Sequence, residues 1–372
     1  MKFLKRVVAL SLVATLSLGI FGVMPLAGAE LRTLTVEEAA RRAVSNNSAI
    51  ANAQDSESVA DERISRAQEA VWDSVIDAQL TDASANLRSA ELARSLNIRD
   101  IQARQQYVEF RITRDFNTIL NMQADLALAQ ENLALAEREL VIARLRLSLG
   151  VISERDYEAA EQDVTRIQSN IEVLNISIGN EFRSLNNSMG AGLNNLDTQY
   201  ELELELAYEP LGRVNLNQHA QMFERESLAV QVAANNVEVA GYRVDYFATP
   251  FNPLTGQIVP APTLEEVIVS LNRESRGLTD ARQGMQVGAV DMYNGLRELE
   301  IHVRALELEL SHAERQLETL QTMYKIGRIT QIEVDRVEFQ ISSLENNLRR
   351  LKNEHTLLVM IFNNPNLIRP GG

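Results

Sequence analysis

The side chains that most often perform chemistry are scarce in this chain or lack the spacing that chemistry needs. The sequence contains no cysteine, which excludes disulfides, thiolate metal sites and a cysteine nucleophile. None of the four histidines has another histidine four positions away, and no H-E-x-x-H motif occurs; they are His219, His302, His312 and His355. Phosphate-loop, dinucleotide and G-x-S-x-G motifs are also absent. We therefore predict that the protein is not an enzyme and holds no metal and no cofactor.

One short motif of glycine, hydroxyl and acid occurs twice. The two copies are Gly150, Val151, Ile152, Ser153 and Asp156, and Gly327, Arg328, Ile329, Thr330 and Glu333. Glycine suits the left-handed position that follows a helix end. A hydroxyl residue with an acid three positions later is typical of the capped start of the next helix. Each motif therefore predicts a sharp turn between two long antiparallel helices. Capping explains these residue types, but not why an apolar residue recurs before the hydroxyl in both copies.

The two turns belong to an internal repeat. No glycine or proline interrupts the chain from Glu30 to Leu149, and this stretch is rich in residues that favour helices. Runs without breakers return at 296–326 and 328–364. Matching the two turn glycines gives an offset of 177 residues, which also aligns apolar and acidic positions downstream, and a looser match at 180 sets Leu34 against Val214.

These observations predict a mainly α fold made of two tandem repeats of long antiparallel coiled-coil helices. Helical repeat 1 spans 30–190, a linker spans 191–213, and helical repeat 2 spans 214–372. In the linker, apolar and acidic residues alternate from Tyr200 to Glu209, which predicts a short strand or extended segment with solvated glutamates. We expect the helix before the first turn to begin near Asp100.

The long helix of the first repeat carries two apolar rows. The first row is Leu126, Leu133, Leu140 and Leu147, with Ala129, Ala136 and Ala143 between them. The second row, about 200° around the helix, is Leu128, Leu135, Ile142 and Leu149. Two such rows predict a neighbouring helix on each of two nearly opposite sides, as in a closed ring of helices; a helix inside an ordinary bundle is the alternative. In the second repeat the second row weakens to Ala305, His312, Thr319 and Ile326.

Residues 1–29 have the features of a signal peptide. Lys2, Lys5 and Arg6 precede an apolar run, and an Ala-Gly-Ala cleavage site closes it at 27–29. An uncleaved membrane anchor is the alternative. No later segment reaches the roughly 20 apolar residues that a membrane-spanning helix needs. We therefore expect an exported protein of the cell envelope (periplasmic, outer membrane-associated or at the cell surface) and not a cytoplasmic one.

Net charge narrows the class of partner. The net charge of the chain is −15, and the net charge of residues 30–372 is −18, because the leader contributes three basic residues and no acid. Nucleic acid and anionic membrane surfaces bind basic patches, so neither is expected as the main partner. The single tryptophan, Trp72, is expected to be a packing anchor.

The order of leader, opening helix and two copies of long helix, glycine turn and long helix resembles the TolC-type outer-membrane efflux protein family. The specific parts of this resemblance are the opening 34–47 and the segments around the two turns, 145–156 and 323–333. In that family three chains close a hollow barrel of helices. The resemblance implies a homotrimer whose turns contact a periplasmic adaptor protein and an inner-membrane transporter. It implies that the adaptor-contacting residues are 150–153 and 327–330, and that Asp156 and Glu333 stand near a tip constriction.

The chain departs from the family in the segments where each family repeat has a pair of transmembrane strands. In the first repeat this place, 71–99, is rich in helix formers and has no turn residue. In the second it is 245–263, which holds four prolines and is too short for two strands of about 9–11 residues and a turn. We therefore predict no membrane β-barrel. The expected function is a passive helical conduit for efflux or secretion; the alternative is a secreted structural coiled-coil envelope protein without transport activity.

Overall fold

The computed structural model describes residues 32–74, 77–248, 251–252, 256–258 and 262–368. The predicted signal peptide lies outside these residues. One compact unit begins at Thr33 and contains every helix and strand found in the described residues. No helix in this described part combines the length and the apolar character that crossing a bilayer requires.

Helices dominate the described residues, and two similar sets of elements follow one another along the chain. The first set and the linker consist of β1 (Thr33–Thr35), α1 (Val36–Ser45), α2 (Ser48–Ser58), α3 (Ala60–Trp72), α4 (Asp77–Ser148), α5 (Glu154–Ser188), η1 (Leu193–Asn195) and β2 (Glu201–Glu203). The second set consists of α6 (Leu216–Glu226), α7 (Leu228–Asp245), β3 (Phe251–Asn252), β4 (Gln257–Ile258), α8 (Leu264–Lys325), α9 (Gln331–Asn363) and η2 (Pro365–Leu367). The predicted mainly α fold of two tandem repeats is confirmed.

The correspondence between the two sets holds at the level of single residues. Helices α1 and α6 begin at Val36 and Leu216, 180 residues apart, as the looser sequence match predicts. The caps of α2 and α7, Asn47 and Ser227, are also 180 residues apart. The two turns between long helices keep the offset of 177. The repeat is therefore present in the structure as well as in the amino-acid sequence.

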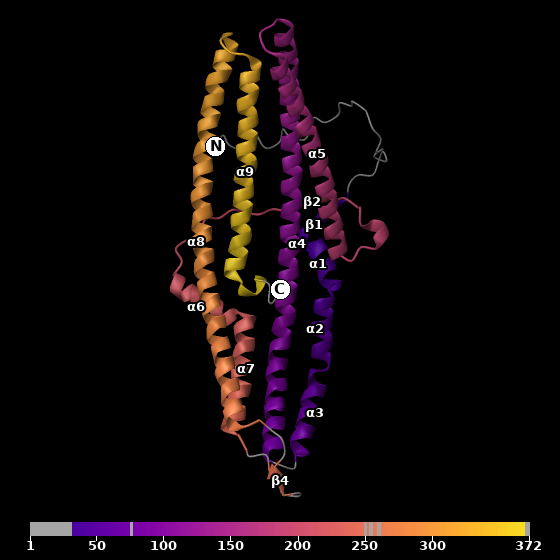
Figure 1. Ribbon diagram of the computed structural model, residues 1–372, viewed down its shortest axis with the longest axis vertical. Helices are drawn as coiled ribbons and strands as arrows, with labels where there is room; N and C mark the ends of the chain where they lie inside the picture. The colour runs from indigo at the N-terminus through magenta and orange to yellow at the C-terminus, as the bar shows by residue number, and fades with distance from the viewer. Residues whose placement is uncertain (1–31, 75–76, 249–250, 253–255, 259–261, 369–372) are drawn as a thin grey trace, which may run out of the picture. The chain divides into compact units, whose positions relative to one another are not determined.

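The long helices lie side by side in one layer (Figure 1). Toward the turns, α4 packs against α5 on one side and α9 on the other, while α9 packs against α8. Toward the opposite end, α3 and α7 take the places of α5 and α9 beside α4, and α7 packs against α8. The two neighbours that the two apolar rows of α4 predict are thus both present in one chain.

Helix α4 is longer than the sequence predicts. It begins at Asp77 rather than near Asp100 and holds 72 residues, which is about 108 Å at a rise of about 1.5 Å per residue. No breaker interrupts the extra turns, so the expected start was wrong. Conversely, helices end near Asn46, Val59 and Asp73 without glycine or proline. Asn47 explains the first break, because its side chain accepts hydrogen bonds from the amides of the next helix.

The two segments in which the family has strands differ from each other in structure. In 71–99, the described residues belong to the end of α3, a short connection, and the beginning of α4. In 245–263, β3 pairs with β4 in antiparallel register, with Phe251 opposite Ile258. The first segment is therefore helical, as its composition predicts.

The main apolar core lies where α1, α4 and α5 meet the strand pair β1–β2. Its largest buried side chains include Phe116, Phe182 and Leu185. Strand β1 runs parallel to β2, with Leu34 opposite Leu202, so the linker is fastened to the beginning of the unit. The glutamates of β2 are exposed while Leu202 is buried, which confirms the alternation predicted for this segment.

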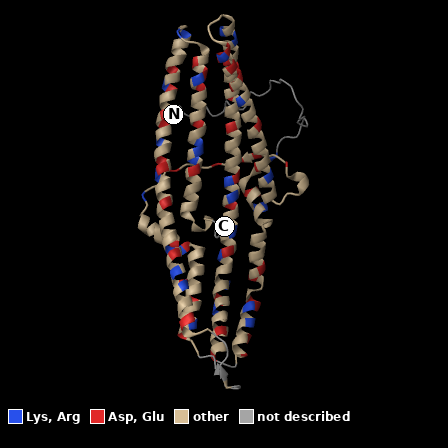
Figure 2. Ribbon diagram, viewed as in Figure 1, with Lys and Arg blue, Asp and Glu red and all other residues tan. Residues whose placement is uncertain are grey.

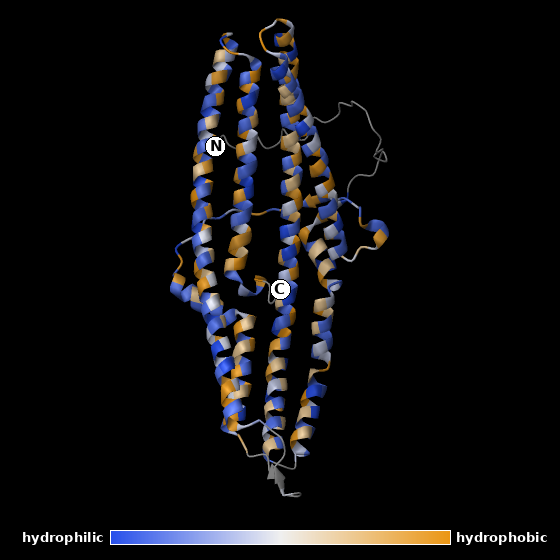
Figure 3. Cartoon of the chain, in the orientation of Figure 1, coloured by the Kyte–Doolittle hydropathy of each residue, from blue (hydrophilic) through white to orange (hydrophobic). Residues whose placement is uncertain are grey.

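Apolar and charged residues alternate along every long helix. Figure 3 shows hydrophobic and hydrophilic residues mixed along α4, α5, α8 and α9, and Figure 2 shows acidic residues dispersed over the same helices. The negative charge is therefore spread over solvated helix faces, consistent with the helical periodicity of the sequence.

Candidate functional site

The two glycine turns have the same backbone geometry. Gly150 has φ +68° and Gly327 has φ +72°, the left-handed conformation that glycine adopts without steric cost. At the first turn the amide of Gly150 donates to the Leu147 carbonyl at 2.9 Å, and that of Val151 donates to the Arg146 carbonyl at 2.9 Å. This pair of bonds is a Schellman motif, which satisfies carbonyls at the end of α4. The end of α8 closes in the same way, with equivalent bonds to the carbonyls of Tyr324 and Met323.

A capping box starts the helix that follows each turn. The Asp156 carboxylate accepts from the Ser153 amide at 3.1 Å and from the Ser153 hydroxyl at 2.8 Å. The Glu333 carboxylate accepts from the amide and the hydroxyl of Thr330, both at 2.8 Å. The turns predicted from the sequence are therefore present, with the predicted residues in the predicted roles.

These capping bonds stabilise the charged form of both acids. The hydroxyl and the amide of Ser153 lower the pKa of Asp156. The amide and the hydroxyl of Thr330 lower the pKa of Glu333, and Arg336 adds a smaller effect. Both carboxylates are exposed and therefore ionised at neutral pH. A role of Asp156 and Glu333 at a constriction stays a prediction.

Apolar side chains at the turns face solvent. Leu149 is 69%, Val151 68% and Ile326 63% exposed. The apolar residues before the hydroxyls, Ile152 and Ile329, are half-buried. Exposed apolar side chains therefore lie on or beside both capped turns. We call residues 150–153 and 327–330 together the tip surface.

The two turns lie at the same end of the unit (Figure 1). Near them, two charged pairs join α4 to α9. Arg138 pairs with Asp335, and Arg336 Nε donates to Glu139 Oε1 at 2.6 Å. Each helix thus offers one acid and one base at neighbouring positions. Farther from the turns, Asp125 of α4 accepts hydrogen bonds from two residues of α9, Arg350 at 2.5 Å and Asn346 at 2.8 Å.

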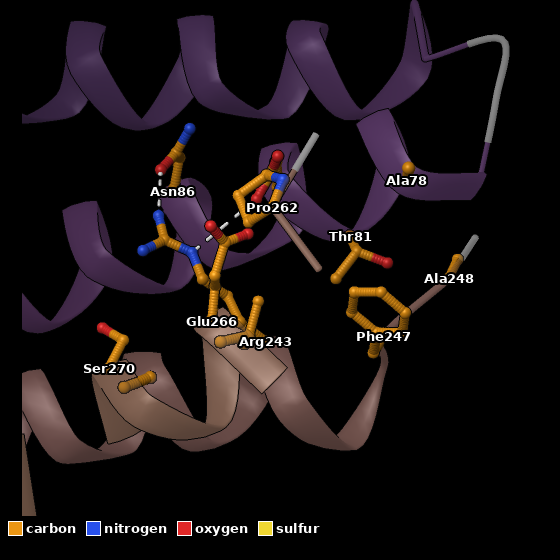
Figure 4. Close-up of a pocket in the computed structure, with 12 residues that line it drawn as sticks. Ala78, Thr81, Asn86, Arg243, Phe247, Ala248, Pro262, Glu266 and Ser270 are labelled. Carbon is orange, nitrogen blue, oxygen red and sulfur yellow. Dashed lines mark hydrogen bonds and ion pairs between the residues drawn. The ribbon is translucent and has the colours of Figure 1, made fainter. Parts of the chain in front are cut away.

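A cavity of about 480 Å³ lies at the opposite end, between α4, α7 and α8 (Figure 4). Arg243 is its most polar feature and interacts with Asn86 at 3.2 Å and Asp82 at 3.7 Å. Phe247 and Pro262 give it an apolar wall.

Trp72, at the end of α3, is 87% exposed, so the expectation that it anchors packing was wrong. The helix ends at this residue, and the side chain reaches no core. The exposure of Trp72 therefore follows from its position at the end of a short helix. The residue type alone does not predict it.

The histidines occupy different environments. His302 and His312 are exposed on α8. His219 stacks on Phe362 with ring centroids 3.8 Å apart, and its Nε2 lies 2.9 Å from the Phe362 carbonyl. His355 is fully buried. Among the described residues, no three histidine or carboxylate side chains are grouped to hold a metal ion.

One buried polar group was not predicted from the sequence. Glu300 of α8 is 4% exposed and lies beside His355 of α9. The offset of 177 contained a signal for it, because His355 aligns with Ile178, which is an apolar core residue in the first repeat. The repeat alone shows that a histidine replaces an isoleucine at this position, and the structure adds that the position is buried.

A layer of long helices in two tandem repeats, with paired capped turns at one end, is the TolC-type fold. Three solved outer membrane proteins share it over most of the chain. The Campylobacter jejuni CmeC outer membrane channel matches with a TM-score of 0.59 at 11% identity, over 88% of this chain and 85% of that one. VceC, an outer membrane protein of Vibrio cholerae, matches with 0.58 at 12% identity, over 88% and 96%. The open Neisseria gonorrhoeae MtrE outer membrane channel matches with 0.52 at 12% identity, over 88% of each chain.

The likeness lies in structure and not in sequence. No family model matches the chain. No curated protein matches it either. At identities of 11–12% the solved structures establish the fold.

Proposed function

We propose that the protein is the subunit of a passive helical conduit for efflux or secretion in the cell envelope. The observation that carries the proposal is the match to two outer membrane channels, each over 88% of the chain. The conduit would be a homotrimer working with a periplasmic adaptor protein and an inner-membrane transporter. The leader at 1–29 would export the chain, and the two repeats, 30–190 and 214–372, would each supply one part of the tunnel wall.

The lateral edges of the helical layer support assembly of several copies. Helices α5 and α8 lie at opposite edges of the layer (Figure 1). On α5, Val173 and Ile176 are 58% and 65% exposed; on α8, Ile301 and Leu308 are 59% and 72% exposed. Apolar side chains on both edges suit burial against the neighbouring copy, which would close the layer into a ring. The weak second apolar row of α8 is exposed in the single chain, as an edge helix requires.

The tip surface supports the docking of an adaptor. Its residues are Gly150, Val151, Ile152, Ser153, Gly327, Arg328, Ile329 and Thr330. The capping bonds fix the backbone of both turns, so a partner would meet Val151 on the first turn, and Ile326 beside the second, with little loss of backbone entropy. We propose that Asp156 and Glu333, exposed beside the turns, supply the negative charge at the narrow end of the conduit.

The alternative function, a structural coiled-coil protein that conducts nothing, is not favoured. Such a spacer needs neither two open apolar edges nor two paired turns in fixed register. Catalysis is not favoured either, because the matched structures are channels and membrane proteins.

The assembly state and permeability of the mature chain test the proposal. Residues 30–372 should form a stable trimer in mass measurements by light scattering, and particle images should show a central hollow. Lipid vesicles or planar bilayers carrying the trimer should gain an ion conductance only if the conduit also enters a membrane. A monomeric or dimeric chain without a central hollow would contradict the conduit.

A further inference from the structure

The linker between the repeats crosses a buried polar cluster on α8 and α9. Glu300 is 4% exposed and His355 is 0% exposed, and both lie beneath linker residues 207–212. The first repeat has apolar core at the position of His355, where Ile178 is 6% exposed. The cluster is therefore a special feature of the second repeat and not a requirement of the helical layer.

Glu300 and Arg297 fasten the linker to α8. Glu300 Oε1 accepts from the Leu211 amide at 2.5 Å, and Oε2 accepts from Arg297 Nη1 at 2.8 Å. The Arg297 guanidinium also donates to the carbonyls of Leu211 and Gly212, both at 3.0 Å. A single ion pair thus binds both the donor and the acceptor groups of the linker backbone. Because these bonds involve charged groups, they are stronger than ordinary backbone hydrogen bonds.

His355 lies beside the same carboxylate oxygen. Its Nε2 lies 3.5 Å from Glu300 Oε1, the atom that holds the Leu211 amide. Neither ring nitrogen has a hydrogen-bond partner among the described residues. The ring also meets the edge of Tyr208 with centroids 4.9 Å apart, so the linker covers it directly.

Several charged groups surround this cluster. Burial lowers the pKa of His355, the Glu300 carboxylate opposes this effect, and Arg297 reinforces it. Burial also disfavours ionised Glu300, but the hydrogen bonds from Arg297 and Leu211 outweigh it and lower the pKa of that carboxyl. Around Tyr208 lie further charges on α8 and α9, which are Arg304, Glu307 and Lys352. From α4, the neutral Asn117 contacts α9 through Asn353 at 2.8 Å.

We propose that Glu300, Arg297 and His355 form an acid-sensitive latch, which holds the linker on α8 at neutral pH and releases it when His355 takes a proton from solvent. An imidazolium would draw Glu300 Oε1 toward the usual distance of about 2.8 Å for a charged pair. This attraction only partly offsets the cost of the new charge, because burial and the neighbouring Arg297 cation both disfavour an imidazolium in the latched state. The pKa of His355 in the latched state lies below its ordinary value of 6.5. Release therefore takes up a proton, and the latched state loses stability as the pH falls below about 6.5.

Hydrogen–deuterium exchange of linker peptides covering 205–213 tests the latch. Protection factors, corrected for the intrinsic effect of pH, are compared between about pH 7.5 and 5.5 in the full-length mature chain. We expect the protection factor of the Leu211 amide to fall about tenfold in the wild type. Release takes up one proton, so the equilibrium between the latched and released states shifts about tenfold for each pH unit below the ordinary pKa of histidine. In His355→Ile, which places the first repeat's residue in the second, protection should stay constant. His312→Gln, an exposed histidine of α8, is the matched control and should behave as the wild type.

Nuclear magnetic resonance of the four histidine rings of the wild type gives a second measurement, in which the variant serves only to assign the His355 signal. The signal that His355→Ile removes should titrate between pH 7.5 and 5, in step with the loss of linker protection. An unchanged pH dependence in His355→Ile, or a ring that does not titrate in this range, would overturn the latch. Neither result bears on the conduit, because the latch lies within one chain and needs no assembly.

Discussion

Gly150, Gly327 and Gly190 all end long helices with positive φ, but their surroundings differ. Gly150 and Gly327 have open space where a Cβ would lie. At Gly190, which follows α5 with φ +76°, a Cβ would stand 2.4 Å from Asn46 Cγ. Asn46 cannot withdraw cheaply, because its amide donates to the carbonyls of Met189 and Arg42 at 3.0 and 2.8 Å. The same backbone motif therefore serves as an open turn in one place and as a close contact in another.

Alanine substitution separates these two situations. Gly150→Ala should cost about 1 kcal/mol of unfolding free energy, which reflects the left-handed backbone alone. Gly190→Ala should cost about 2–4 kcal/mol, since it adds a steric clash and disturbs the Asn46 bonds. Urea unfolding followed by circular dichroism measures both. Equal losses in the two variants would show that the contact with Asn46 contributes nothing.

The capping acids allow a second test at the residue scale. Ser153→Ala removes the hydroxyl that contributes most to the lowered pKa of Asp156. The pKa of Asp156 should therefore rise toward the ordinary 3.8. A carboxyl with a lowered pKa stabilises the folded state above its ordinary pKa, and this contribution is lost as the pH falls through the lowered value. In the variant, the stability of the folded state should therefore depend less on the ionisation of Asp156. A titration of the carboxyl groups followed by nuclear magnetic resonance measures the pKa of Asp156. Glu333, capped by Thr330, is the internal control and should titrate unchanged.

At the scale of elements, reciprocal charged pairs decide how α4 and α9 are aligned. Apolar rows repeat every seven residues, so a slip by one heptad would preserve most apolar contacts. The pairs Arg138–Asp335 and Glu139–Arg336 tolerate no such slip. Asp335 is only 11% exposed, whereas Arg138 is 59% exposed, so solvent weakens the attraction without removing its directional effect.

A charge-reversal cycle tests this register. Arg138→Glu should destabilise the chain by roughly 0.5–1 kcal/mol, because it places two acids together at the α4–α9 contact. The double variant Arg138→Glu/Asp335→Arg should recover most of that loss. Thermal unfolding of the wild type, both single variants and the double variant gives the coupling energy. Additive effects in the double variant would show that the pair does not couple the helices.

At the scale of the whole molecule, the single chain leaves apolar edges that a closed ring would bury. The exposed residues on α5 and α8 belong to different repeats, so one copy's first repeat would meet the next copy's second repeat. Such an interface would pair two different helices of the repeated unit, because α5 corresponds to α9 and α8 corresponds to α4.

Edge substitutions should therefore separate folding from assembly. Ile176→Glu or Leu308→Glu should leave helix content unchanged, because both side chains already face solvent in the single chain. Either should weaken trimer formation at least tenfold, since burying a charge in place of an apolar side chain costs more than about 1.5 kcal/mol. Analytical ultracentrifugation over a range of concentrations measures the change. Leu193→Asp, at an 88% exposed position on the linker, is the matched control and should assemble normally. Trimers of undiminished stability in both edge variants would place the interface elsewhere.

Local signals account for the parts of the fold that the sequence predicted well. The capped turn follows from a few neighbouring residues, because its glycine, hydroxyl and acid lie within six positions of one another at Gly150, Ser153 and Asp156. The repeat and the two apolar rows follow from periodicity. The start of α4 was missed because helix formers continue upstream of Asp100. The break before α2 was missed because an asparagine cap can end one helix and begin another without glycine or proline.

The long helices, their capped turns and their duplication follow from the amino-acid sequence, because helix formation and capping depend on residues a few positions apart. Tertiary structure alone decided which side chains meet across the layer. It placed Asp335 opposite Arg138, left Trp72 in solvent, and brought the Glu300 oxygen between Leu211 and His355. These choices depend on contacts between residues 55 to 197 positions apart. Helical periodicity specifies that a face is buried, but not which partner buries it.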